Sequence, residues 1–437
     1  MLSPLLLMIF MLSTGFAVVF MMGTHYIVAR TNGRSGTLTV TADVAAIPTF
    51  HFTSPWHAIR TILAVLVLGT TTGIVATRFV FGIGAITNLS NQFPLGIWIG
   101  FDVMSGVALA AGGFVITAMA HIFNIERFKP LARPAVLTAL LGYILAVGGL
   151  MVDLGRPYNV WRPLVHWQYH SPLWEVGVCV ATYTSVLFME FLPIILERLN
   201  DFEFITKRLP IMPIYHRLKK ISILFVITGV VLSTLHQSSL GSLWVLLPTK
   251  VYPLWYSIYL PVFFWLSAIA AGLTMTIVES TLSSKAFKRG LELDVLADLA
   301  LITSVVLTIY MIVKGADLYS KGDWTLLRKQ NLQTASFFAE MGLGVYVPAV
   351  LFAIKPLRYK PAVLFSGALM VVVFGISLNR LNVSLIGLWP YTGRIYTPSW
   401  MELMVTTALV GLGVIIFGQL AKYLPIFPDE SEHGSSH

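Results

Sequence analysis

Long apolar stretches separated by short polar connections dominate the chain. Crossing about 30 Å of hydrocarbon takes roughly 20 apolar residues in a helix, and eleven stretches meet this requirement. We predict spans near 4–28, 58–80, 96–122, 133–152, 173–196, 219–240, 256–280, 296–314, 333–354, 361–380 and 400–421. The predicted fold class is an all-α polytopic membrane protein, a helical bundle of ten core transmembrane helices plus an extra N-terminal one.

These stretches divide the chain into three parts. Residues 1–57 read as an N-terminal transmembrane anchor and a polar connection, 58–425 as the transmembrane bundle, and 426–437 as a disordered cytoplasmic tail. The first stretch differs from a secretory signal because its start has no basic residue and Arg30 and Arg34 follow it. We expect it to be retained as an anchor.

Composition agrees with a lipid environment. Of 437 residues, 56% are hydrophobic and 11% are charged, whereas soluble domains are about a quarter charged. The net charge of +9 does not indicate nucleic-acid binding, because the Lys and Arg residues lie mainly in the short connections. Cys179 is the only cysteine, which excludes intrachain disulfides and protein-bound iron–sulfur or zinc sites that need several cysteines.

The basic residues also predict an orientation. With eleven spans, the connections alternate between the two sides of the membrane. One side carries 19 of the 29 Lys and Arg residues. The other carries 10, namely Arg78, Arg156, Arg162, Lys250, four residues from Lys314 to Lys329, Arg380 and Arg394. Because basic loops stay in the cytoplasm, we predict the N-terminus outside and the C-terminus in the cytoplasm.

Four spans bring titratable groups to the predicted outer side: Asp102, Asp153, Glu175 and His236. An ionisable group at membrane depth is costly and therefore suggests function. Quinol oxidation releases two protons, so a quinone site needs a partner for each carbonyl oxygen and a proton acceptor, roles that suit Asp and His. The cluster predicts quinone binding.

Neighbouring residues extend this candidate site. Trp98 and Phe101 could clamp an aromatic ring, although aromatic residues at this depth also form interface belts. Asp153 and Arg156 could instead form a local ion pair or stabilise the helix end. Asp102 and His236 could serve only in hydrogen bonds between helices. The convergence of four spans on one side favours the functional interpretation.

A second set of residues could carry protons across the membrane. His121, Glu190 and Glu279 end spans on the predicted inner side, and Glu340 lies about two turns into its span from the outer side. They are candidates for a proton path. Alternatively, the inner acids pair with loop arginines such as Arg127 or Arg198.

Metal and haem sites have little support in the sequence. His166 and His170 have the spacing of a helical metal pair, but Pro163 and Pro172 bracket them and no third ligand is near. Bis-histidine haem needs facing histidines, and His25 with His121 is the remaining combination within one leaflet. We expect no metal, no haem and no iron–sulfur cluster bound by this chain.

Several motifs resemble the NrfD/polysulfide-reductase-type integral membrane subunits, most closely the HybB-like branch found in hydrogenase-2-type nickel–iron hydrogenases. The resemblance covers about 58–425, and its most specific part is the run from His236 to Ser242. The matching segments are Phe93-Pro94-Leu95-Gly96, Phe101-Asp102, Asp153-Leu154-Gly155-Arg156, Leu173-Trp174-Glu175, Glu190-Phe191, His236-Gln237-Ser238-Ser239-Leu240-Gly241-Ser242 and Pro253-Leu254-Trp255.

The resemblance implies a quinone-interacting component of a multisubunit respiratory oxidoreductase in a bacterial or archaeal cytoplasmic membrane. It implies menaquinone or another quinone near the periplasmic face, surrounded by Asp102, His236, Glu175, Asp153 and Arg156. It further implies a periplasmic ferredoxin-like partner with four [4Fe–4S] clusters. That partner would be joined by a nickel–iron hydrogenase, a molybdopterin enzyme or a multihaem cytochrome c. We expect no catalysis of the soluble half-reaction by this chain itself.

Two other functions remain open. A proton- or ion-coupled secondary transporter would also hold carboxyl groups in a bundle, but it typically shows inverted repeats and broken helices at the midplane. A passive membrane anchor would explain the spans and not the converging acids. Residues 1–57 have no counterpart in the hydrogenase-type membrane proteins, which leaves the identity of the partner open.

Overall fold

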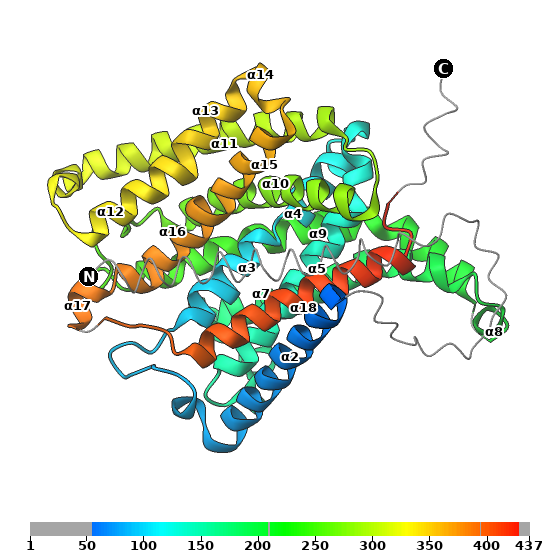
Figure 1. The fold of residues 1–437 in the computed structure, drawn as a ribbon, viewed down its shortest axis with the longest axis horizontal. Coiled ribbons are helices and arrows are strands. Elements are labelled where there is room, and N and C mark those ends of the chain that lie inside the picture. The colour runs from blue at the N-terminus through cyan, green and yellow to red at the C-terminus, as the bar shows by residue number, and fades with distance from the viewer. Residues whose placement is uncertain (1–54, 209, 394, 428–437) are drawn as a thin grey trace.

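The computed structural model describes residues 55–208, 210–393 and 395–427, and they form a helical fold without strands (Figure 1). Ten helices in this part of the chain are long and apolar enough to cross a membrane. They are Thr61–Phe81, Trp98–Ile122, Glu126–Asp153, Pro172–Leu199, Ile211–Val245, Leu260–Phe287, Leu293–Ser320, Leu332–Ala353, Pro361–Thr392 and Trp400–Tyr423. The predicted all-α bundle with ten core spans is confirmed. The predicted span 4–28 lies outside the described residues.

Seven spans are built around a single continuous helix. These are α2 (Pro55–Phe81), α5 (Lys129–Asp153), α7 (Pro172–Leu199), α9 (Ile211–Val245), α10 (Leu260–Phe287), α11 (Leu293–Ser320) and α18 (Trp400–Tyr423). Several run beyond the predicted apolar stretches because helices continue past the hydrocarbon into charged segments. In α9, for example, the helix begins at Ile211 and includes Lys219 and Lys220.

The other three spans contain wider π-helical turns. The first is η2 (Trp98–Val103), α3 (Met104–Leu109), α4 (Gly112–Thr117) and η3 (Ala118–Ile122). The second is α12 (Leu332–Phe338), η7 (Ala339–Tyr346) and α13 (Val347–Ala353). The third is α15 (Pro361–Met370), η8 (Val371–Ser377), α16 (Leu378–Leu381), η9 (Asn382–Ile386) and α17 (Trp389–Thr392). Such turns often occur at functional sites, and η2 and η7 contain the buried acids Asp102 and Glu340.

The spans from Trp98 to Thr392 form two four-helix units. In the first, the span Trp98–Ile122, α5, α7 and α9 contact one another in sequence order, and α9 returns to the first span. In the second, α10, α11, α12–α13 and α15–α17 form the same kind of circuit. The units meet where α10 packs against α3, α4 and α9, and α18 lies across α5 beside α2 (Figure 1).

Glycines set the closest approaches in this packing. A Cβ atom on Gly272 of α10 would lie 2.5 Å from the backbone nitrogen of Gly112 in α4. Within the second unit, a Cβ atom on Gly344 would lie 2.1 Å from the nitrogen of Gly375. Membrane helices lack a hydrophobic drive to associate, so small residues that allow close backbone contact are a main source of packing energy.

The short helix η4 (Glu126–Phe128) begins the span Glu126–Asp153. Other short helices lie in the connections: η1 (Ile83–Ala85), η5 (Pro157–Asn159), α6 (Arg162–Val165), α8 (Glu203–Thr206), η6 (Asp323–Arg328) and α14 (Lys355–Arg358). The connection between α9 and α10 enters the protein, because Trp255 is fully buried there and Tyr252 N donates to Gly387 O at 2.9 Å. His166 and His170 do not share a helix, since α6 ends at Val165.

Candidate functional site

Asp102 lies in a buried position where three spans meet. It belongs to η2 and is 7% exposed. Thr406 of α18 donates a hydrogen bond from Oγ1 to Asp102 Oδ2 at 2.9 Å. On the other side the carboxyl group packs against α5 at Gly149, where an added Cβ would lie 3.1 Å from Asp102 Cβ. The acid that the sequence placed in this span is therefore buried, and a hydrogen bond fixes its position.

The start of α18 supplies a second buried acid beside this position. Glu402 is fully buried and accepts hydrogen bonds from Ser399 N at 2.7 Å, from Asn88 N at 3.1 Å and from the Tyr396 hydroxyl. Burial and the adjacent Glu402 raise the pKa of Tyr396 well above its usual value, so the hydroxyl stays protonated and donates. Trp98 Nε1 donates to the backbone oxygen of Glu402 at 3.2 Å.

An arginine from α2 caps the C-terminal end of α5. Arg78 is 4% exposed and donates from Nε to Val152 O at 2.6 Å and from its terminal nitrogen to Leu154 O. It thereby satisfies carbonyl groups that a helix end leaves without partners. Asp153 lies beside them, whereas Arg156 is exposed and forms no ion pair with Asp153. The alternative of an Asp153–Arg156 ion pair is therefore wrong, whereas a role of Asp153 at the helix end stays open.

His236 lies in the core of the first four-helix unit. Its ring is fully buried, and Nδ1 shares a hydrogen bond with the Tyr143 hydroxyl of α5 at 2.8 Å. Tyr143 in turn contacts Tyr183 of α7 edge to face, with ring centroids 4.6 Å apart. His236 Nε2 and both amide atoms of Gln237 are buried without a hydrogen-bond partner. Such atoms are costly in a dry interior, so a polar ligand or water would be favoured there.

Asp102 and His236 approach α5 at different heights. Asp102 packs at Gly149 and His236 binds Tyr143, six residues and therefore about 9 Å apart along the helix. Trp98 and Phe101 pack in one cluster beside Asp102, with Val152 and Val405. Glu175 is half-buried in the first turn of α7 and Arg156 is exposed. The structure thus brings together Asp102, Trp98 and Phe101, with Asp153 at the neighbouring helix end.

Sequence reasoning missed four members of this region, Arg78, Tyr396, Glu402 and Thr406. A signal for one of them is present, because Ser399-Trp400-Met401-Glu402 has the spacing of a capping box, which the structure shows. Arg78 could not be found in this way, since its partners are backbone carbonyl groups of another span.

The residues of the predicted proton path lie in separate places. Glu279 of α10 accepts a hydrogen bond from the Thr138 hydroxyl, in the seam between the units. Glu190 faces Gly229 between α7 and α9, and His121 is exposed at the end of its span. The suggested pairing of inner acids with Arg127 and Arg198 is wrong, because these arginines pair with Asp298 and Asp201.

Glu340 is the centre of a buried polar cluster in the second unit. It accepts hydrogen bonds from Trp255 Nε1 at 2.8 Å, Asn379 Nδ2 at 2.7 Å and Asn382 Nδ2 at 2.6 Å. Two buried cations lie nearby: the Arg380 guanidinium stacks 3.7 Å from the Phe264 ring centroid, and Lys314 Nζ lies 4.8 Å from that of Phe263. Both cations were among the basic residues predicted on the outer side.

Comparison with known proteins identifies the family of this chain. Residues 85–387 match the family described as polysulphide reductase, NrfD. The chain belongs to the NrfD family. This confirms the resemblance inferred from the motifs around Asp102 and His236, and it places both residues inside the matched region.

The names of similar proteins indicate the kinds of complex in which they occur. The probable Ni/Fe-hydrogenase 2 b-type cytochrome subunit of Escherichia coli is 31% identical over 83% of this chain and 92% of its own. The menaquinone reductase integral membrane subunit of Nitratidesulfovibrio vulgaris is 31% identical over 80% and 87%. A putative membrane subunit of dimethyl sulfoxide reductase from Halobacterium salinarum is 25% identical over 81% and 90%.

The described side chains are not arranged to hold a metal ion. Within 55–208, 210–393 and 395–427, no three His, Cys, Asp or Glu side chains are grouped closely enough for this purpose. His25 lies outside these ranges. The predicted absence of haem stays a prediction, all the more because one relative is named a b-type cytochrome subunit.

Proposed function

We propose that this NrfD family member is the quinone-interacting integral membrane subunit of a multisubunit respiratory oxidoreductase complex. The observation that carries the proposal is a buried carboxyl group, Asp102, held by Thr406 at the junction of three spans, in a family with a relative named for menaquinone reduction. The chain would exchange electrons between menaquinone or another quinone and a partner subunit.

The residues at this junction suit a quinone. Asp102 can accept a proton. His236 lies about 9 Å away along α5, and its free Nε2 can bind a carbonyl oxygen. Trp98 and Phe101 supply apolar aromatic surface beside Asp102. Glu175, Asp153 and Arg156 lie at helix ends around this region and would form its rim. A quinone supplies the redox chemistry, and the protein supplies orientation and the proton acceptor.

The partners are proposed from the family. Relatives are named as subunits of a nickel–iron hydrogenase, a menaquinone reductase and a dimethyl sulfoxide reductase. For this chain we infer a periplasmic ferredoxin-like partner with four [4Fe–4S] clusters. It would act with a hydrogenase, a molybdopterin enzyme or a multihaem cytochrome c.

Burial supports the proposed orientation. Arg78, Lys314 and Arg380 were counted among ten basic residues on the outer side, but all three are buried within the protein. Excluding them leaves seven basic residues outside against 19 inside. The positive-inside bias is therefore stronger than the sequence count suggested, and it favours Asp102 near the periplasmic face with the C-terminus in the cytoplasm.

Proton translocation through Glu190, Glu279, Glu340 and His121 remains a proposal. Each of the three acids lies in a different part of the bundle, and no hydrogen bond joins any two of the four residues in the described part of the chain. A path would need water between them.

The test is Asp102→Asn in the purified native complex. This substitution keeps the size and hydrogen bonding of the side chain and removes the base, so quinone-linked turnover should fall by roughly 10²-fold or more. The soluble partner's activity with an artificial dye should remain, because that electron path bypasses the membrane-embedded chain. Asp201→Asn, at an exposed position paired with Arg198, is the matched control. Parental quinone turnover in an assembled Asp102→Asn complex would falsify the site.

A further inference from the structure

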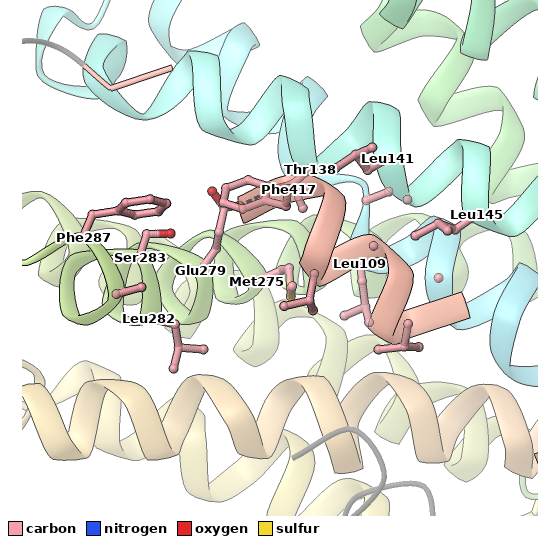
Figure 2. Close-up of a pocket in the computed structure, with 17 residues that line it drawn as sticks. Leu109, Thr138, Leu141, Leu145, Met275, Glu279, Leu282, Ser283, Phe287 and Phe417 are labelled. Carbon is pink, nitrogen blue, oxygen red and sulfur yellow. Dashed lines mark hydrogen bonds between the residues drawn. The ribbon is translucent and has the colours of Figure 1, made fainter. Parts of the chain in front are cut away.

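An apolar cavity of about 180 Å³ lies in the seam between the two four-helix units (Figure 2). Side chains from α3, α5, α10 and α18 line it, and among the lining residues are Leu109, Leu145, Met275, Val410 and Phe417. The cavity is not closed on all sides. The Glu279 carboxyl group and the Thr138 hydroxyl, joined by their hydrogen bond, line the middle of the cavity, and Ser283 and Phe287 line the end beyond them (Figure 2).

The end opposite Ser283 and Phe287 leads to Asp102. Gly106, Leu145 and Val410 line the cavity, and each lies four residues from a residue at the carboxyl group: Asp102 itself, Gly149 and Thr406. Four residues are about one helical turn, or about 6 Å. Three different spans therefore place the start of the cavity one turn below the Asp102 carboxyl group.

The lining determines what the cavity can hold. Apolar cavities of this kind stay dry, so the space does not suit a water chain between Asp102 and Glu279. A hydrocarbon chain fits it. Asp102 lies beside one end and Glu279 lines the middle, which disfavours a phosphate head group at these positions, and Arg78 at the Asp102 end is already bound to Val152 O and Leu154 O. A neutral head group with a flexible apolar tail meets these conditions.

We propose that this cavity binds the isoprenoid tail of the quinone whose head group lies at Asp102. The inference rests on the proposed function and adds the direction in which the quinone lies. Its tail runs from Asp102 toward Glu279, between α18 and the helices α3, α5 and α10. Because the cavity is not closed on all sides, the tail can enter it from outside the bundle.

Gly106 allows a direct test. It lines the cavity, and a Cβ atom added there meets nothing within 4 Å, so Gly106→Leu fills the space without a backbone clash. Gly73→Leu is the matched control, since Gly73 is an exposed glycine of α2 whose Cβ would also meet nothing within 4 Å. The full chain in nanodiscs is titrated with tailed menaquinone-4 and with tail-less menadione, and binding is followed by quenching of tryptophan fluorescence.

Gly106→Leu should raise the Kd for menaquinone-4 about tenfold, as overpacking typically does, and leave the Kd for menadione unchanged. Gly73→Leu should change neither value. An unchanged menaquinone-4 Kd, or an equal rise for both ligands, overturns the tail assignment alone. If the parental chain binds neither ligand, the proposed function fails and the tail assignment fails with it.

A second measurement applies to the parental chain and needs no variant. Menaquinone carrying a photoreactive group on its tail should cross-link to peptides containing Leu109, Met275 or Val410. Cross-links confined to α7 and α9 would overturn the inference. Retention of a phospholipid that is lost only in Gly106→Leu, with cross-links elsewhere, would equally show that the cavity holds lipid instead.

Discussion

At the scale of residues, the position of Asp102 depends on two neighbours. Thr406 holds one carboxyl oxygen by a hydrogen bond, and Gly149 leaves room for the side chain against α5. A carboxyl group that must accept a proton has to be positioned to within a fraction of an ångström. Gly149 therefore contributes to the site by leaving the space that fixes the position of Asp102.

Gly149→Ala tests this positioning role. The added Cβ would lie 3.1 Å from Asp102 Cβ and so displace the acid, and quinone-linked turnover should fall about tenfold or more because small displacements are costly. Gly148→Ala is the control, since its Cβ would meet only Leu409 Cδ2 at an ordinary 3.6 Å. Turnover measured at saturating quinone, with thermal unfolding of both variants, separates positioning from stability. Equal turnover in the two variants would contradict this role.

His236 makes a separate contribution at the residue scale. His236→Ala removes the hydrogen bond to Tyr143 and the free Nε2. If Nε2 binds a quinone carbonyl, the Kd for menadione should rise by a factor equivalent to about 1–3 kcal/mol. Tyr143→Phe is the matched comparison, because it removes the same internal hydrogen bond and keeps Nε2. Equal effects of the two substitutions would show that His236 is structural.

At the scale of helices, close glycine contacts hold the spans in register. The Gly344–Gly375 crossing lies in the second unit. In the same unit Glu340 accepts hydrogen bonds from Trp255, Asn379 and Asn382. The π-helical turns η7 and η9 carry Glu340 and Asn382. A wider turn redirects side chains without ending the span, which allows two spans to bring these polar groups together.

Gly344→Ala tests this crossing. Its Cβ would lie 2.1 Å from Gly375 N, so the two spans must separate, at a cost of typically about 1–3 kcal/mol or more. Thermal unfolding in detergent should shift clearly downward. Gly342→Ala, two residues away with no atom within 4 Å of the added Cβ, should leave the midpoint nearly unchanged. Matching midpoints for the two variants would contradict the assigned contact.

At the scale of the whole molecule, the buried basic residues sharpen the expected orientation. Reporter cysteines placed in the connections 201–216 and 320–330 of a Cys179-free chain should respond differently to an impermeant reagent. Labelling from the periplasm in intact cells should occur at 320–330 and not at 201–216. The opposite result would invert the topology and place Asp102 at the cytoplasmic face.

The arrangement of the helices also bears on whether this chain binds haem. His236 is bound to Tyr143 within the first unit, and His121 is exposed at the end of a different span, so these two do not face each other across a cofactor space. Expressed without partners, the chain should show no Soret band above background. A stoichiometric bis-histidine signal that disappears in His121→Ala would contradict this expectation.

The spans, their number in the described residues and the presence of buried acids followed from sequence alone. A bilayer imposes helix length and apolarity on each segment separately, so hydropathy and the motifs around Asp102 and His236 were sufficient. The neighbours of each acid could not be predicted in this way. Thr406 meets Asp102 and Glu279 meets Thr138 across 304 and 141 residues of sequence. Such contacts depend on how the helices pack and rotate, and hydropathy carries no information about rotation. The tertiary structure alone therefore decided that Asp102 adjoins an apolar cavity and that Arg78, Lys314 and Arg380 are buried inside the protein.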